Sequence, residues 1–273
     1  MLLQRVITAA VLAPLVILLI LFGSTALLAL IAGAIFLGAL WEWARLAGLK
    51  TVAPQAALIV VAAAAMVFLW ISRATAVTPL LVVLGVIWWL VACVWLRLFA
   101  YAAAPTSENR ALKLLAGAFV VLPAWVAMVS IHGRYLHGAG LTLLALVIVW
   151  AADIGAYFSG RAFGQRKLAP QISPGKTWAG AYGALVAGVV VSVLSGWWLL
   201  DLRGLPLIGL AVLAIVTVAA SIVGDLIESL MKRHAQVKDS GTIVPGHGGL
   251  MDRLDSVFAA LPVFAIGLML LLP

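Results

Sequence analysis

Five of the nine acidic residues of this chain lie in one stretch near its C-terminus: Asp225, Glu228, Asp239, Asp252 and Asp255. Four of them form two pairs, each with its members three positions apart, and Asp239 lies between the pairs. On a helix this spacing places two side chains on one face. Neighbouring carboxylates repel each other unless a cation lies between them, so each pair is a candidate ligand set for a divalent metal. For the first pair, a salt bridge between Glu228 and Lys232 is the alternative.

Basic residues and glycines are interleaved with these acids. The basic residues are Lys232, Arg233, Lys238 and Arg253. Gly248 and Gly249 precede an apolar run, and glycines ahead of a helix permit a turn whose N–H groups bind phosphate. Such a turn beside carboxylates requires a bridging cation such as Mg²⁺. Without a second His or Cys at ligand spacing, His247 does not indicate zinc. The stretch therefore has the parts of a phosphoryl-transfer site.

A second polar segment, QISPGKTWAG, covers residues 171–180. Ser173 is expected to cap a helix that starts at Pro174, whose free N–H groups and the Lys176 charge would bind an anion. The run 175–177 resembles the end of a P-loop, but Pro170 replaces the first required glycine and no strand is expected before it. We therefore reject that motif. An ordinary helix start is the alternative.

Asp153 lies inside a long apolar run. Burying a charged Asp at the centre of a membrane helix costs about 2.5–3.5 kcal/mol, so this side chain should face a polar interior or a partner. Tyr157, Gly160 and Arg161 follow at spacings that place all four residues near one helix face. This face leads into a basic loop, which favours a functional role. An Asp that holds helices together by hydrogen bonds is the alternative.

The elements that carry these residues are predicted to be membrane helices. The chain has 273 residues, of which 66% are hydrophobic and 10% charged, far from the composition of a soluble domain. Since a spanning helix needs about 20 apolar residues, we predict an all-α polytopic integral membrane protein with about nine transmembrane helices. The expected spans are 6–22, 25–44, 53–71, 78–101, 112–131, 141–160, 178–200, 205–230 and 252–272. No cleavage site follows the first run, so it is a helix rather than a signal peptide.

The basic residues predict the orientation. With nine spans, 14 of the 17 Lys and Arg residues fall on the side of the N-terminus and 3 on the other side. Positive residues collect in the cytoplasm, so the N-terminus and the loops 161–177 and 231–251 are expected there, with the C-terminus opposite. The net charge of +8 is spread over loops, which argues against nucleic acid and for anionic lipids or phosphate substrates. We expect one membrane-embedded domain, residues 1–273, with N-terminal hydrophobic helices in 1–140 and a catalytic C-terminal half in 141–273.

The C-terminal motifs resemble those of the phosphatidate cytidylyltransferases, also called CDP-diacylglycerol synthases. The resemblance rests on Ser229 to Arg233, Lys238 to Gly241 and Pro245 to Asp255, which lie within a stretch of about 27 residues with many fixed positions. Two earlier segments, Asp153 to Gly164 and Ile172 to Trp178, also resemble segments of this family. In the N-terminal half the resemblance lies only in hydropathy.

This resemblance implies that the protein converts CTP and phosphatidic acid into CDP-diacylglycerol and pyrophosphate. Mg²⁺ would be required, and K⁺ is a candidate second ion. It also implies a homodimer in the bacterial inner membrane. Asp225 and Asp252 would bind the metal, with Glu228 and Asp255 as further ligands or supports, and Lys176 and Arg253 would complete the catalytic set. The expected substrate-binding residues are Ser173, Lys176, Thr177, Lys232, Arg233, Lys238, Asp239, His247, Gly248, Gly249, Asp153 and Tyr157.

Three other classes of protein remain open. A secondary transporter also carries intramembrane carboxylates, but it predicts internal repeats and helices broken at mid-membrane. A CTP-dependent enzyme acting on another lipid phosphate would have the same nucleotide half of the site. A purely structural membrane protein leaves the polar loops without a role.

Overall fold

The computed structural model describes the backbone of residues 2–134, 136–198, 200–243 and 248–272, and side chains from residue 10 onward. Within these residues the chain forms nine helices and one two-stranded sheet. The elements are α1 (Leu2–Phe22), α2 (Thr25–Leu46), α3 (Val52–Ile71), α4 (Val77–Arg97), α5 (Ser107–His132), α6 (Gly138–Phe163), β1 (Lys167–Ala169), β2 (Ser173–Thr177), α7 (Trp178–Trp198), α8 (Leu205–His234) and α9 (Met251–Leu271).

The predicted class, an all-α polytopic membrane protein, is confirmed. Among the described residues, eight helices are long and apolar enough to cross a membrane, and α1 adds the apolar segment Ala10–Phe22. Long apolar runs become helices because a helix satisfies every backbone polar group internally, where no water is available. The predicted spans overlap the nine helices, and their ends differ by up to five residues: α5 begins at Ser107, α8 continues to His234 and α4 ends at Arg97.

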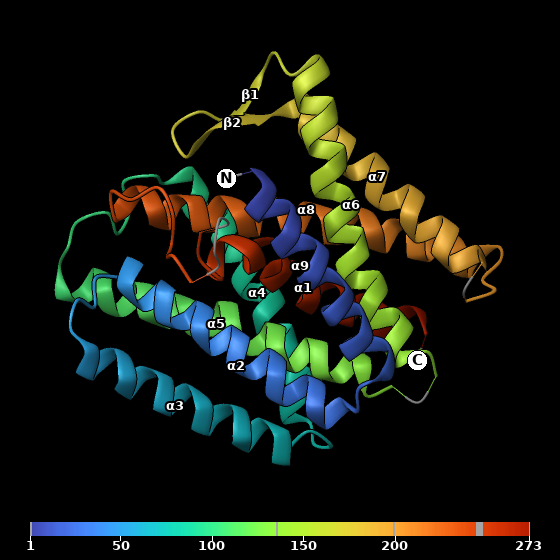
Figure 1. The fold of residues 1–273 in the computed structure, drawn as a ribbon, viewed down its shortest axis with the longest axis horizontal. Coiled ribbons are helices and arrows are strands. Elements are labelled where there is room, and N and C mark those ends of the chain that lie inside the picture. The colour runs from blue at the N-terminus through green and yellow to red at the C-terminus, as the bar shows by residue number, and fades with distance from the viewer. Residues whose placement is uncertain (1, 135, 199, 244–247, 273) are drawn as a thin grey trace.

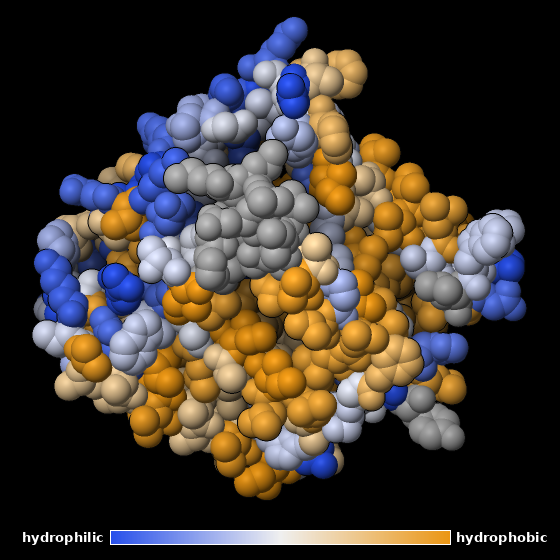
Figure 2. Space-filling view, viewed as in Figure 1, coloured by the Kyte–Doolittle hydropathy of each residue, from blue (hydrophilic) through white to orange (hydrophobic). Residues whose placement is uncertain are grey.

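Helix α9 lies at the centre of the bundle, where it contacts α2, α4, α5, α6 and α8. Helix α3 contacts α2 and α5 at one edge, and α6 packs along α7 at the opposite side (Figure 1). Large apolar side chains cover much of the visible surface, with polar residues gathered mainly towards the upper left and the right-hand edge (Figure 2). This pattern fits a bundle that is surrounded by lipid and has two polar ends.

The prediction of a helix starting at Pro174 is wrong. Residues Ser173–Thr177 form strand β2, which pairs antiparallel with β1, and α7 begins only at Trp178. Pro174 is tolerated because a strand of a two-stranded sheet has one unpaired edge that needs no N–H donor. The helix cap is supplied by Thr177, whose Oγ1 accepts a 3.1 Å hydrogen bond from the N–H of Gly180. The anion-binding helix terminus expected at Ser173 is therefore absent.

Candidate active site

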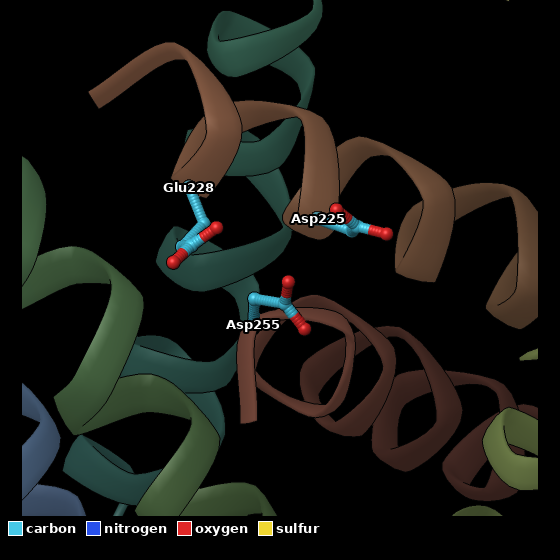
Figure 3. Close-up of side chains that lie close together, drawn as sticks. All are labelled: Asp225, Glu228 and Asp255. Atoms are coloured by element: carbon cyan, nitrogen blue, oxygen red, sulfur yellow. The ribbon is translucent and has the colours of Figure 1, made fainter. Parts of the chain in front are cut away.

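Three carboxylates meet where α8 and α9 cross. Asp225 and Glu228 extend from α8 and Asp255 extends from α9 towards the same space (Figure 3). One oxygen atom of each carboxylate lies within 4.8 Å of the others. The helical spacing of three places the first two on one face, and the packing of α9 against α8 adds the third. We call Asp225, Glu228 and Asp255 the carboxylate cluster.

Two lysines contact this cluster from different elements. Lys176 of β2 forms an ion pair with Asp225. Lys232 of α8 lies one turn beyond Glu228, and its Nζ is 2.5 Å from Glu228 Oε2. The predicted salt bridge from Glu228 to Lys232 therefore exists alongside the cluster. Repulsion among the three carboxylates is partly offset by these two ammonium groups.

Asp252 borders the carboxylate cluster, where it neighbours Glu228 and shares Lys232 with it, and it organises the loop between α8 and α9 (residues 235–250). Its Oδ2 accepts hydrogen bonds from the N–H of Gly249 at 2.9 Å and the N–H of Ser240 at 3.0 Å, while Oδ1 is 2.7 Å from Lys232 Nζ. From the first turn of α9 the side chain reaches back to these two N–H groups, which belong to the preceding loop. Asp252, expected to bind metal together with Asp225, is therefore not one of the three carboxylates of the cluster, and its metal-binding role stays a prediction.

A cavity of about 460 Å³ adjoins the cluster between α6, β2, α7 and α8. Its polar lining includes Asp153, Tyr157, Arg161, Lys176, Thr177 and Asp225, and its apolar lining includes Ala184 and Ile222. Asp153 and Tyr157, predicted to line a polar cavity, both line this one. The Arg161 guanidinium donates a 3.2 Å hydrogen bond to the Tyr157 hydroxyl. The cavity therefore presents polar groups of both charge signs among apolar side chains.

Other predicted residues lie around this centre in different settings. Arg233 and Lys238 lie along a separate surface hollow with Gln236 and Val237. Arg233 Nε also donates a 3.0 Å hydrogen bond to the Ile172 carbonyl, which links α8 to the hairpin. Ser173 pairs with Ala169 at the start of β2.

The remaining predicted residues belong to α9 and the loop before it. Asp239 and Arg253 have exposed side chains. Gly248 has a φ of +84°, which a glycine adopts without strain, as a tight turn requires. His247 lies outside the described residues. The substrate-binding roles of all these residues stay predictions.

Glu42 of α2 contacts the α8–α9 loop, which the sequence did not reveal. It is 1% exposed, and its Oε2 accepts hydrogen bonds from Ser240 Oγ at 2.9 Å and from the N–H of Met251 at 2.8 Å. In the sequence, the tryptophan-rich segment around Glu42 is typical of a helix end at the membrane interface. In the structure, Trp43 is also buried and donates to the Lys113 carbonyl. A lone acid in an apolar helix was the available signal, the same one that identified Asp153.

The carboxylate cluster fits a divalent cation. Carboxylate oxygens are the hard ligands that Mg²⁺ prefers, and three of them converge here from two helices. Glu228 Oε1 is buried and has no hydrogen-bond partner among the described residues. A buried carboxylate oxygen without a partner is costly, and a bound cation would remove that cost.

The fold and this site define an integral membrane protein with a charged centre at one end of its helix bundle. A family model described as "Cytidylyltransferase family" matches residues 3–271. The chain therefore belongs to the cytidylyltransferase family. The match includes the N-terminal half, where the sequence motifs suggested a likeness only in hydropathy.

Named relatives agree with this family. A protein of Pseudomonas aeruginosa named phosphatidate cytidylyltransferase is 42% identical over 265 residues, which cover 97% of this chain and 96% of the relative. One of the same name from Haemophilus influenzae is 37% identical over 286 residues, with 97% of this chain and 98% of the relative covered. A third, from Bacillus subtilis, is 43% identical over 131 residues, 47% of this chain and 48% of the relative.

Proposed function

We propose that this protein transfers the cytidylyl group of CTP to phosphatidic acid, yielding CDP-diacylglycerol and pyrophosphate in phospholipid biosynthesis. The observation that carries the proposal is the carboxylate cluster, flanked by Lys176 and Lys232 beside a mixed polar and apolar cavity. Membership of the cytidylyltransferase family and the names of the two full-length relatives support the same reaction.

The reaction is a phosphoryl-type substitution between two anions. A phosphate oxygen of phosphatidate forms a bond to the α-phosphorus of CTP, and the bond from that phosphorus to the bridging oxygen breaks. The electron pair leaves with pyrophosphate. Because the nucleophile is already anionic, the residues need not remove a proton from it. They must bring two like charges together and stabilise the charge on the leaving group.

The lysines can bind the phosphates, and the cavity can hold the lipid substrate. Lys176 lines the cavity and contacts Asp225, so its ammonium group can bind a phosphate at the edge of the cluster. Lys232 is 16% exposed and supplies positive charge on the other side of the cluster. Arg161 and Tyr157 can orient a lipid phosphate in the cavity, whose apolar residues accommodate the adjoining part of the lipid.

Mg²⁺ is part of the proposal, held by Asp225, Glu228 and Asp255. When bound, it supplies positive charge that offsets the phosphates and the leaving pyrophosphate. Asp252, predicted as a metal ligand, also fixes the α8–α9 loop and Lys232, and its part in metal binding stays a prediction. A monovalent cation such as K⁺ remains a candidate second ion.

The proposed setting is the bacterial cytoplasmic membrane, with the N-terminus and the active-site loops in the cytoplasm and the C-terminus opposite. The charge asymmetry of the loops supports this orientation, and cytoplasmic loops have access to CTP. A homodimer is also proposed, on the basis of the family resemblance. Native mass spectrometry of the detergent-purified protein tests it by the presence of a species of two chains.

One assay tests the reaction. Purified protein in detergent is incubated with Mg²⁺, radiolabelled CTP and a panel of phosphatidic acid, a polyprenyl phosphate and an ether-linked lipid phosphate. The proposal expects CDP-diacylglycerol and an equal amount of pyrophosphate with phosphatidic acid as the preferred acceptor. Preference for another lipid phosphate would replace the substrate, and no turnover with any acceptor would overturn the proposal.

A further inference from the structure

Glu42 is a buried acid whose hydrogen-bond partners, among the described residues, lie in the α8–α9 loop and at the first residue of α9. Its carboxylate accepts hydrogen bonds from Ser240 Oγ at 2.9 Å and the N–H of Met251 at 2.8 Å. A buried carboxylate is costly unless hydrogen bonds satisfy it. At 1% exposure it is shielded from substrates. Any effect on the reaction must therefore pass through the residues it binds.

The α8–α9 loop is shaped around this carboxylate. A Cβ atom added at Gly241 or at Gly249 would lie under 3.0 Å from carboxylate atoms of Glu42. Only glycine permits this approach of the loop backbone. The N–H of Gly249 meanwhile donates to Asp252 Oδ2. Gly249, predicted to let the backbone approach phosphate, thus also lets it approach Glu42.

A chain of polar contacts runs from Glu42 to the carboxylate cluster. Ser240 Oγ lies 2.9 Å from Glu42 Oε2 and 3.0 Å from Asp252 Oδ2, and its single proton can be donated to one of them at a time. Asp252 Oδ1 in turn lies 2.7 Å from Lys232 Nζ. Lys232 completes the path, with its Nζ 2.5 Å from Glu228 Oε2.

We infer that Glu42 is a positioning residue for the active site, which holds the α8–α9 loop through Ser240 and Met251 and thereby holds Asp252 against Lys232. The inference rests on the proposed function, since it concerns the same site. It assigns a task in catalysis to the N-terminal half of the chain, which the sequence motifs left without one. The side chain acts as a hydrogen-bond acceptor and makes no contact with CTP or lipid.

Two substitutions at this position separate hydrogen bonding from packing. Glu42→Leu keeps a side chain of similar size but removes both acceptor atoms. Glu42→Gln retains one amide oxygen, which can accept both hydrogen bonds that Oε2 accepts. A residue that only fills space would tolerate leucine, whereas a positioning residue requires the acceptor.

Gln55 of α3 provides a matched control. It is also buried, at 4% exposure, and its Nε2 donates a 2.5 Å hydrogen bond to the Leu49 carbonyl beyond α2. Gln55→Leu therefore removes a buried polar contact near the same end of α2, but one that involves no residue of the α8–α9 loop. Its effect measures the general cost of such a loss.

The experiment compares kcat, KM for CTP and trypsin cleavage after the exposed Lys238 in the detergent-purified variants. We expect Glu42→Leu to lower kcat by about ten-fold or more. Cleavage after Lys238 should be faster in this variant, because the loop has lost its anchor. Glu42→Gln should recover most of the activity and the slow cleavage, and Gln55→Leu should resemble the wild type in both.

The inference fails if Glu42→Leu has wild-type kcat and cleavage, or if Gln55→Leu reduces kcat as strongly. It also fails if Glu42→Gln is as impaired as Glu42→Leu. The trypsin comparison requires no substrate, so it tests the anchoring of the loop even if the wild-type protein releases no pyrophosphate. A wild-type protein that releases no pyrophosphate would contradict the proposed function and not the role of Glu42 in the loop.

Discussion

Lys232 and Asp252 form a 2.7 Å ion pair that connects the end of α8 to the first turn of α9. The side chain of Asp252 is 7% exposed and that of Lys232 is 16% exposed. Both ends of the α8–α9 loop are therefore held by one charged contact. Because Lys232 also contacts Glu228, this pair controls where a positive charge lies beside the carboxylate cluster.

Replacing Asp252 with asparagine should nearly abolish activity. The amide of Asp252→Asn is neutral, so Lys232 loses a buried ionic partner, a loss that costs about 3–5 kcal/mol for buried pairs. We expect CTP-dependent pyrophosphate release to fall by about 100-fold or more, with the protein still inserted in the membrane. Radiometric assay of purified protein provides the measurement.

Asp201→Asn is the control for this substitution. Asp201 forms a 2.7 Å ion pair with Arg203, but these side chains are 90% and 51% exposed, and exposed pairs contribute little. This variant should retain wild-type activity. Retained activity in Asp252→Asn would remove Asp252 from the active site.

The carboxylate cluster predicts a specific dependence on Mg²⁺. Chelation by EDTA should abolish turnover, and added Mg²⁺ should restore it. Asp255→Asn removes one of the three converging carboxylates, so the Mg²⁺ concentration for half-maximal activity should rise by about ten-fold. Glu108→Gln, an exposed acid in the first turn of α5, is the control and should leave the Mg²⁺ titration unchanged. An unshifted titration in Asp255→Asn would exclude Asp255 as a ligand.

Lys176 should contribute to both substrate binding and turnover. It lines the cavity and pairs with Asp225, so Lys176→Ala removes a phosphate-binding charge and leaves a carboxylate without its partner. We expect kcat/KM for CTP to fall by about 100-fold. Lys167→Ala changes an exposed lysine of the same hairpin and should have little effect. Equal effects of the two substitutions would indicate that the hairpin as a whole, rather than Lys176, is required.

The proposed topology can be tested by cysteine labelling. Ser240, within the predicted cytoplasmic loop, is only 5% exposed, so it is a poor labelling site. Lys238 is exposed and is the better position. In a Cys93→Ala background, Lys238→Cys should react with a membrane-impermeant maleimide only after the cells are opened, whereas Asp201→Cys should react in intact cells. The reverse pattern would overturn the nine-span orientation.

The membrane class, the helices and the acidic motif could be predicted because their signals are local. An apolar run of sufficient length can satisfy its backbone in a membrane only as a helix, so α3 or α9 follows from composition and length. The spacing of three between Asp225 and Glu228 places them on one helix face wherever α8 packs. The charges of the loops likewise predict an orientation without reference to any contact.

The hairpin marks the limit of such local reasoning. Ser173 and Thr177 both have side chains that cap helices well, and Pro174 suits the first turn of a helix. The competition between two possible helix starts was decided by the pairing of Lys167 with Thr177 and of Ala169 with Ser173. Neither segment, taken alone, indicates that this pairing will form.

The sequence by itself therefore determined that this is a helical membrane protein and that acids, lysines and glycines gather near the ends of its last two spans. Only the tertiary structure decided that Asp255 joins Asp225 and Glu228, that Asp252 organises the loop, and that Glu42 supports that loop from 198 residues away. The reason is physical: helical periodicity relates residues a few positions apart. Which carboxylates come within reach of one another depends on how α2, α8 and α9 pack, and that packing is set by side chains distributed over the whole chain.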